Sequence, residues 1–259
     1  MNPRLPPLDM HAHVDGQVPQ RDLESLGAVV FAATRSQIEF SRTLSRSDQV
    51  VVWGLGCHPG VLAAQERFDV EAFRTQITST PFVSEIGLDS RSKVSGEIQL
   101  QTLRAILEIA VERPRILSIH SAGRTQAVLD LIDTVRPQGV ILHWWLGTES
   151  ETRRAVELGC YFSVNHAMAS RPQVDMIPHD RLLLETDHPS GDRHSPGLRR
   201  PGATQTTEAD VARRIGITEE QLRERQWHNL SAMVAQLDLA SLFPKAIQRM
   251  LTYASTTLR

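Results

Sequence analysis

Two histidines stand two residues apart near the N-terminus, within residues 9–13 (DMHAH). If this segment is a β-strand, alternate side chains point the same way, so His11 and His13 share one face with Asp9. Neutral imidazoles bind transition metals, and two on one face form half of a metal site. For an isolated pair, a surface or packing role is the alternative. The pair therefore directs attention to other ligands along the chain.

Five more residues of the same chemistry stand at the ends of short apolar runs: His58, Glu85, His120, His143 and Asp187. In a parallel barrel the carboxyl ends of all strands open on one face, where the chemistry of this fold resides. A single histidine in such a place is ordinarily packed or solvated. Seven histidines and acids at strand ends of one barrel instead indicate a shared site.

The elements that would position these residues follow an alternating pattern. Eight apolar runs are separated by helix-periodic stretches, and the runs cover residues 5–10, 27–32, 50–56, 82–88, 115–119, 139–142, 160–164 and 182–185. Their near-continuous hydrophobicity is typical of parallel strands buried on both faces. Helices are expected at residues 99–112, 125–135 and 151–158, and Thr218 with Gln221 predicts a capping box.

This alternation predicts an α/β fold, a single (β/α)8 TIM barrel over residues 1–259 with a C-terminal helical tail at about residues 240–259. A closed barrel is favoured over an open doubly wound sheet because no glycine-rich dinucleotide fingerprint follows the first run.

Composition indicates which binding partners and which cellular location to expect for the protein. The 259 residues are 41% hydrophobic and 22% charged, and the formal net charge of −2 gives no global attraction to nucleic acid. A polyanionic substrate would then depend on local positive charge or on metal. No apolar run approaches the roughly 20 residues of a membrane span, and the N-terminus has no signal-like apolar stretch. With only Cys57 and Cys160 present, we expect a reducing, cytoplasmic location without membrane association.

The motifs, taken in order, resemble the TatD family of metal-dependent deoxyribonucleases, within the amidohydrolase-like barrels. The matching segments are residues 9–13 (DMHAH), 56–59 (GCHP), 85–89 (EIGLD), 119–121 (IHS), 142–144 (LHW) and 185–187 (ETD). Asn229 also resembles the asparagine of the family's last helix. Each motif is weak alone, whereas the ordered set, over residues 8–230, is specific.

The resemblance implies a two-metal site and hydrolysis of DNA phosphodiester bonds. By analogy one ion is held by His11, His13 and Asp187, the second by His120 and His143, and Glu85 bridges them. Nitrogen and oxygen ligands without thiolate suit Mg²⁺, Mn²⁺ or Zn²⁺ and do not choose among them. Two ions about 3.5–4 Å apart bind a phosphoryl oxygen and lower the pKa of a shared water. Asp187 is the best candidate to accept the proton of that water.

Further residues are given supporting roles. Asp9 is expected to orient an imidazole, and Glu185 is expected on the same strand face as Asp187, with core filling as its alternative. His58 resembles the family's substrate-side histidine. The alternative is a histidine before Pro59 whose hydrogen bonds are satisfied locally, without any contact to substrate.

The loop after the eighth run carries Arg193, Arg199 and Arg200, which supply local positive charge for phosphate unless the loop is merely solvated. Trp144 and Trp145 either stack on a splayed base or pack over the barrel mouth.

The surroundings of the ligands depart from the family pattern. Ala122 stands where an arginine is usual, Trp144 and Trp145 follow the sixth-run histidine, and Ser90 and Arg91 replace aromatic residues. The resemblance to the family therefore predicts the type of reaction better than it predicts the substrate. Hydrolysis of another ester, amide or small phosphoester stays open, as does a non-catalytic scaffold with a vestigial site.

Residues 143–145 and 159–165 (GCYFSVN) resemble the TatD-like component of the Qat anti-phage system more than they resemble the housekeeping members of the family. This resemblance implies a role in antiviral defence, with partner proteins from the same system and nucleic acid as substrate.

Overall fold

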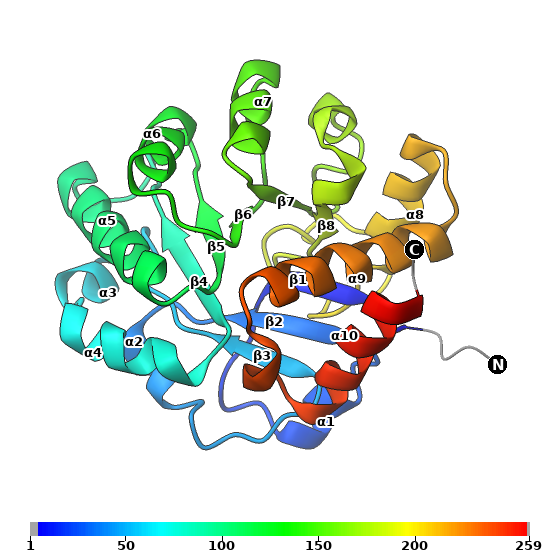
Figure 1. The fold of residues 1–259 in the computed structure, drawn as a ribbon, viewed down its shortest axis with the longest axis horizontal. Helices are drawn as coiled ribbons and strands as arrows, with labels where there is room; N and C mark the ends of the chain where they lie inside the picture. The colour runs from blue at the N-terminus through cyan, green and yellow to red at the C-terminus, as the bar shows by residue number, and fades with distance from the viewer. Residues whose placement is uncertain (1–4, 258–259) are drawn as a thin grey trace.

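Eight parallel strands form the centre of the protein and helices surround them (Figure 1). The computed structural model describes residues 5–257. The strands are β1 Leu8–His13, β2 Val29–Ala33, β3 Val51–Gly54, β4 Phe82–Gly87, β5 Ile116–His120, β6 Val140–Leu142, β7 Tyr161–Val164 and β8 Leu182–Leu184.

Regular pairing divides the strands into two sheets, β1-β2-β3 and β4-β5-β6-β7-β8, each in sequence order. Backbone hydrogen bonds close both seams. At one seam the Leu55 amide donates to the Phe82 carbonyl over 3.0 Å, and at the other the Asp187 amide donates to the His11 carbonyl over 2.8 Å. The strands therefore close into the predicted (β/α)8 barrel, which the structural relatives described below confirm.

The helices lie outside the barrel and at one end of it. They are α1 Gln20–Glu24, α2 Gln37–Ser41, α3 Leu62–Glu66, α4 Val70–Gln76, α5 Gly96–Glu112, α6 Thr125–Val135, α7 Glu149–Glu157, α8 Gln205–Ile215, α9 Glu219–Gln236 and α10 Lys245–Thr257. Short 3-10 turns lie at η1 Ile77–Ser79, η2 Pro172–Met176, η3 His179–Arg181 and η4 Ala240–Leu242. The expected capping box at Thr218 and Gln221 is confirmed at the start of α9.

The barrel interior is apolar at its N-terminal end. Met10, Phe31 and Leu183 from three strands pack in one cluster with Trp227 of α9 and Ile247 of α10. The predicted tail thus forms η4 and α10, and its residues 258–259 lie outside the described part of the chain. Because this end is filled, polar side chains inside the barrel gather at the C-terminal ends of the strands.

Three differences from the sequence-based prediction matter for the site. The first strand covers residues 8–13 rather than 5–10, so His11 and His13 lie on the strand itself, and the last strand ends at Leu184. The pairing of β1 with β2 also shifts register between Asp9 and Ala12. Hydrophobicity alone could not show these features, because strand ends and bulges depend on the pairing partner.

No helix within residues 5–257 has both the length and the apolar character that crossing a membrane requires. Cys57 and Cys160 are both buried free thiols.

Candidate metal centre

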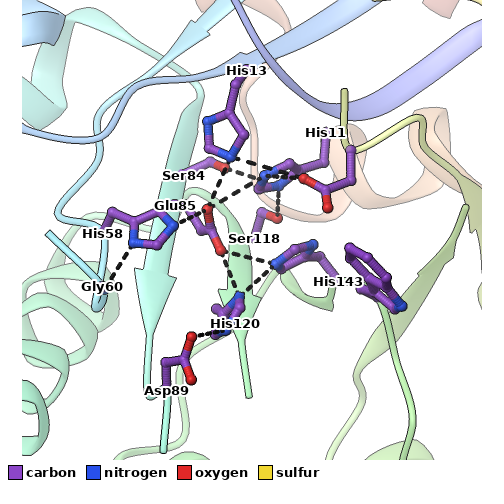
Figure 2. A network of polar contacts seen from close by, with 12 residues as sticks. His11, His13, His58, Gly60, Ser84, Glu85, Asp89, Ser118, His120 and His143 are labelled. Carbon is purple, nitrogen blue, oxygen red and sulfur yellow. Dashed lines mark hydrogen bonds and ion pairs between the residues drawn. The ribbon is translucent and has the colours of Figure 1, made fainter. Parts of the chain in front are cut away.

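Glu85 lies at the centre of a histidine cluster at the C-terminal end of the barrel (Figure 2). Its position on β4 coincides with a second register shift, between Val83 and Ile86 in the pairing with β5. Such bulges re-aim side chains next to active sites. The carboxylate is buried, and its two oxygens face two different groups of histidines.

The Oε2 atom of Glu85 faces three imidazoles. It lies 3.2 Å from His13 Nε2, 3.1 Å from His58 Nε2 and 3.8 Å from His11 Nε2. A second carboxylate completes this side, because Asp187 Oδ1 lies 3.9 Å from His11 Nε2 and 3.8 Å from His13 Nε2. Two carboxylates and three imidazoles therefore converge on one volume.

The Oε1 atom of Glu85 faces the other two histidines of the cluster. It lies 2.7 Å from His120 Nδ1 and 3.0 Å from His143 Nε2, and these two nitrogens are 3.1 Å apart. The other ring nitrogen of His120 lies 3.3 Å from Asp89 Oδ2 (Figure 2). The five histidines at strand ends and both predicted acids thus form one cluster.

His11 is held by hydroxyl groups. Its Nδ1 lies 2.7 Å from Ser118 Oγ and 3.3 Å from Ser84 Oγ, and its ring stacks on that of His143 with centroids 4.2 Å apart. Its Nε2 is buried and has no hydrogen-bond partner among the described residues, although it points at Glu85 and Asp187. A buried lone pair aimed at carboxylates is what a divalent cation between them would satisfy.

His143 is held by a third carboxylate. Glu185 Oε1 lies 3.5 Å from His143 Nδ1 and accepts hydrogen bonds from the backbone amide of Trp144 (3.0 Å) and from Asn165 Nδ2 (3.2 Å). Ser163 donates to the other oxygen. Strand alternation predicted that Glu185 and Asp187 share one face. They do not, because β8 ends at Leu184, before both residues.

Asp187 lies three residues beyond β8 in a left-handed backbone conformation, with φ of 43°. Aspartate tolerates this region better than most residues, but the conformation persists only where neighbours enforce it. The Asp187 amide donates to the His11 carbonyl, and its own carbonyl accepts from the Ser190 amide (2.7 Å) and the Gly191 amide (2.8 Å). These bonds aim the carboxylate at His11 and His13.

Asp9 supports the backbone rather than an imidazole. Its carboxylate accepts hydrogen bonds from the Thr186 amide (2.8 Å), the Thr186 hydroxyl (2.7 Å) and the Gly202 amide (2.7 Å). Its contact with His11 is to the backbone amide, at 3.3 Å. The expected role of orienting an imidazole is therefore wrong, because the bulge in β1 breaks the assumed alternation. Asp9 instead fixes the segment that carries Asp187.

Burial and charge shift the pKa values of these groups in opposite directions. Burial raises the pKa of Asp187 well above its ordinary value. Burial also opposes ionisation of Glu85, but the adjacent histidines, His58 foremost, hold its pKa well below the usual range. Burial and the charge of His143 lower the pKa of His11. For His143, burial acts against the imidazolium, yet Glu185 and Glu85 raise its pKa well above normal.

His58 belongs to the cluster. Its Nδ1 accepts a hydrogen bond from the Gly60 amide at 2.8 Å, so the neutral ring carries its proton on Nε2, which faces Glu85. The ring is one-fifth exposed. His58 is therefore hydrogen-bonded through one ring nitrogen and faces Glu85 with the other, and its substrate-side role stays a prediction.

Three other sequence-based assignments do not reach the cluster. Arg193 is exposed, and its side chain makes no hydrogen bond or ion pair with any residue in the described range. Asn229 donates to the carbonyls of His179 and Leu182, each over 3.0 Å, and so ties α9 to the start of β8. Trp145 is buried and donates to Thr152 Oγ1, which excludes stacking on a base.

Residues that sequence reasoning gave no role support the ligands. They are Ser84 and Ser118 beside His11, Asp89 beside His120, and Ser163 and Asn165 beside Glu185. A signal existed for Ser118, which precedes His120 by two residues and shares its strand face. The Ser163 and Asn165 contacts carry no such signal, since they depend on the neighbouring strand.

Three groups of side chains bring ligand atoms within 4.8 Å of one another and suit a metal ion: His11, His13 and Glu85; Glu85, His120 and His143; and His11, His143 and Glu185. The first two share only Glu85 and divide between its two oxygens. Imidazole nitrogen and carboxylate oxygen are ligands for Zn²⁺, Mn²⁺ and related divalent ions. The residues present therefore fit a metal centre.

Comparison with known families gives a match over most of the chain. The family described as TatD related DNase matches residues 8–234. The human protein named Deoxyribonuclease TATDN3 is 24% identical over 92% of this chain and 94% of its own length. The metal-dependent hydrolase YabD of Bacillus subtilis is 26% identical over 70% of this chain and 79% of its own.

A shorter match is the 3'-5' ssDNA/RNA exonuclease TatD of Citrobacter rodentium, 29% identical over 41% of this chain and 44% of that protein. Among solved structures, the TatD homolog YJJV from Escherichia coli superposes with a TM-score of 0.77 at 21% identity, covering 90% of this chain and 98% of that one. A TatD family hydrolase from Entamoeba histolytica gives 0.70 at 16% identity, over 88% and 98%. These likenesses confirm the barrel fold.

Proposed function

The protein belongs to the TatD family of metal-dependent hydrolases, and from this premise we propose that it is a deoxyribonuclease that hydrolyses phosphodiester bonds with two divalent ions. The observation that carries the proposal is that the two carboxylate oxygens of Glu85 face different histidines. One of its oxygens faces His11 and His13, which Asp187 also approaches, and the other faces His120 and His143. A single bridging carboxylate with nitrogen ligands on both sides suits a pair of cations.

The chain's own groups have distinct tasks in this proposal. Divalent ions, when bound, polarise the phosphoryl oxygen and lower the pKa of water. Asp187 accepts the proton of the attacking water, because its carboxylate borders the cluster, 3.8 Å from His13 Nε2. Glu85 keeps its charge among the histidines and holds the two sides together. Glu185 and Ser118 orient His143 and His11.

The ions are Mg²⁺, Mn²⁺ or Zn²⁺, all compatible with nitrogen and oxygen ligands. DNA is the proposed substrate because relatives of this length carry the name deoxyribonuclease. With a net charge of −2, binding depends on the metal centre and on local cations rather than on overall attraction. A cytoplasmic location and a single domain over residues 1–259 remain predictions of the sequence.

Purified protein should cleave DNA when Mg²⁺ or Mn²⁺ is added, and Asp187→Asn should abolish cleavage. The matched control is Asp238→Asn, since Asp238 is exposed, lies far along the chain after α9 and has a similar left-handed conformation, with φ of 53°. Normal cleavage by the Asp187→Asn protein, with a control that folds and cleaves equally well, contradicts the proposed mechanism.

A substrate panel under the same metal conditions separates the nuclease from its alternatives. Cleavage of a carboxylic ester, an amide or a small phosphoester, with DNA left intact, assigns the centre to another hydrolysis. Full biological function of the folded Asp187→Asn protein supports a scaffold instead.

The anti-phage role is a further prediction, based on residues 143–145 and 159–165. It is tested by plaque formation on cells that express the intact defence operon with Asp187→Asn. Protection equal to that of the wild-type operon contradicts a catalytic contribution to defence.

A further inference from the structure

Gln99 is a buried residue of α5 whose side-chain amide holds the segment that joins β4 to α5. It brackets the main chain of a single residue, because Oε1 accepts from the Asp89 amide at 2.7 Å and Nε2 donates to the Asp89 carbonyl at 3.2 Å. Nε2 also donates to the Val94 carbonyl at 2.9 Å. Both polar atoms of this side chain are therefore bonded to backbone groups of one short segment.

The backbone of Asp89 needs such a partner because of its place just beyond the end of β4. The amides of Leu88 and Ser90, on either side of it, donate toward β5, the first of them to the His120 carbonyl at 2.9 Å. In extended backbone the amide between two such groups points the opposite way. On that side β3 has already ended, so the side chain of Gln99 takes the place of a strand's peptide group.

The carboxylate of Asp89 connects this backbone to the candidate metal centre (Figure 2). Its Oδ1 accepts from the Arg91 amide at 2.8 Å, and its Oδ2 lies 3.3 Å from His120 Nε2. The other ring nitrogen of His120, Nδ1, lies 2.7 Å from Glu85 Oε1. A carboxylate behind an imidazole fixes the plane of the ring and the nitrogen that it presents to a metal. A displacement of the Asp89 backbone would therefore move the nitrogen that faces Glu85.

A second buried glutamine makes contacts of the same kind on the other side of Glu85. Nε2 of Gln65, in α3, donates to the Cys57 carbonyl at 3.0 Å and to the His58 carbonyl at 3.3 Å. It therefore holds the segment that carries His58, whose Nε2 faces Glu85 Oε2. Gln65 and Gln99 are alike in type and burial, and they differ in the segment that each one holds.

We propose that Gln99 is a positioning residue of the metal centre, which fixes the backbone of Asp89 and thereby sets the ring of His120 on the Oε1 side of Glu85. Loss of its side-chain amide leaves the Asp89 amide without this partner, so the segment moves to satisfy that group. The assignment rests on the proposed two-ion function for what His120 binds. The position of the ring is a property of the metal-free protein, so the two proposals can fail separately.

The first test compares three glutamine-to-methionine variants, which keep the length of the side chain and remove its hydrogen bonds. Gln99→Met acts on the Asp89 segment, Gln65→Met acts on the other side of Glu85, and Gln101→Met changes an exposed residue of α5. In NMR spectra of metal-free protein with isotope-labelled histidine, Gln99→Met should shift the ring signals of His120 more than those of His58. Gln65→Met should give the opposite order, and Gln101→Met should leave both sets of signals unchanged.

A double-mutant cycle tests whether Gln99 acts through Asp89. Asp89→Asn keeps the backbone contacts of Gln99 and removes the charge that faces His120, so it should also shift the His120 signals. Adding Gln99→Met to Asp89→Asn should then shift them little further, because the two residues act in series. Fully additive shifts contradict an action through Asp89.

Calorimetric titration with Mn²⁺ measures the consequence for metal binding. Gln99→Met should weaken one of two binding events by about tenfold and leave the other at the parent affinity. Circular dichroism checks that each variant is folded, and if Gln99→Met is not, Gln99→Asn, whose shorter amide cannot reach Asp89, is measured in its place.

Unchanged His120 signals in the folded Gln99 variant overturn the assignment, and so do equal changes in the Gln99 and Gln65 variants. If the His120 signals shift as expected but the parent protein binds fewer than two ions, the positioning role holds and the two-ion proposal fails.

Discussion

The two sides of Glu85 are built from similar ligands but are supported differently. On the Oε2 side, the ring of His11 is held by the hydroxyl of Ser118. On the Oε1 side, the far nitrogens of His143 and His120 face the carboxylates of Glu185 and Asp89. A carboxylate behind an imidazole raises its basicity and strengthens its bond to a metal more than a neutral hydroxyl does. Imidazole ligands of the same type on the two sides of Glu85 therefore need not form metal sites of equal strength.

The bridging carboxylate gives the largest expected effect. Glu85→Gln keeps the shape of the side chain but removes the charge shared by both sides, so both ions should bind weakly and activity should fall by about a thousandfold or more. Activity and bound metal are measured together, with Glu97→Gln, exposed at the start of α5, as the control. Activity near the wild-type level in the Glu85 variant contradicts a bridging role.

Removing one ligand from each side tests whether the sides act separately. His13→Ala should lose the ion on the Oε2 side and His120→Ala the ion on the Oε1 side, each retaining the other, with activity reduced by about a hundredfold or more. Metal content by mass spectrometry gives the number of ions retained. If either variant loses both ions or keeps both, the division at Glu85 is not functional.

Glu185→Gln should affect the Oε1 side alone. It preserves an acceptor for the Trp144 amide but removes the charge opposite His143, so metal affinity on that side should fall by about 10- to 100-fold. Calorimetric metal titration measures this change, and excess metal should restore activity. Glu208→Gln, another buried carboxylate, paired with Arg223 on the far helices, is the matched control. A loss shared equally by both sides argues against a positioning role for Glu185.

Ser118→Ala should give the smallest effect. The hydrogen bond to His11 Nδ1 that it removes is between neutral groups and contributes about 1 kcal/mol, which corresponds to less than about tenfold in affinity. Ser84, at 3.3 Å from the same nitrogen, remains to orient the ring, so Ser84→Ala/Ser118→Ala should lose more. The same metal titration ranks the variants. A loss from Ser118→Ala larger than that from Glu185→Gln reverses the proposed difference between the sides.

The barrel and the residues of the cluster could be predicted from the sequence because both depend on order along the chain. Apolar runs marked the strands, and His11, Glu85, His120 and Asp187 stood at their ends. Parallel strands then bring such residues to one face.

The contacts that hold the candidate ligands in position could not be derived from the order of residues along the chain. Asp9 binds Thr186 across the seam of the barrel, a pairing that the bulge in β1 allows and strand alternation does not show. Glu185 turns toward His143 because β8 ends one residue earlier. Arg46 donates to the Gly16 carbonyl and the His13 amide to the His188 carbonyl, and contacts between such distant segments exist only after the chain has folded.

Anomalous diffraction from crystals soaked in Mn²⁺ tests the central claim most directly. We expect two peaks about 3.5–4 Å apart, one between Glu85 Oε2 and the pair His11 and His13, the other between Glu85 Oε1 and the pair His120 and His143. A single peak, or two peaks that do not share Glu85, contradicts the account of a centre divided by one carboxylate.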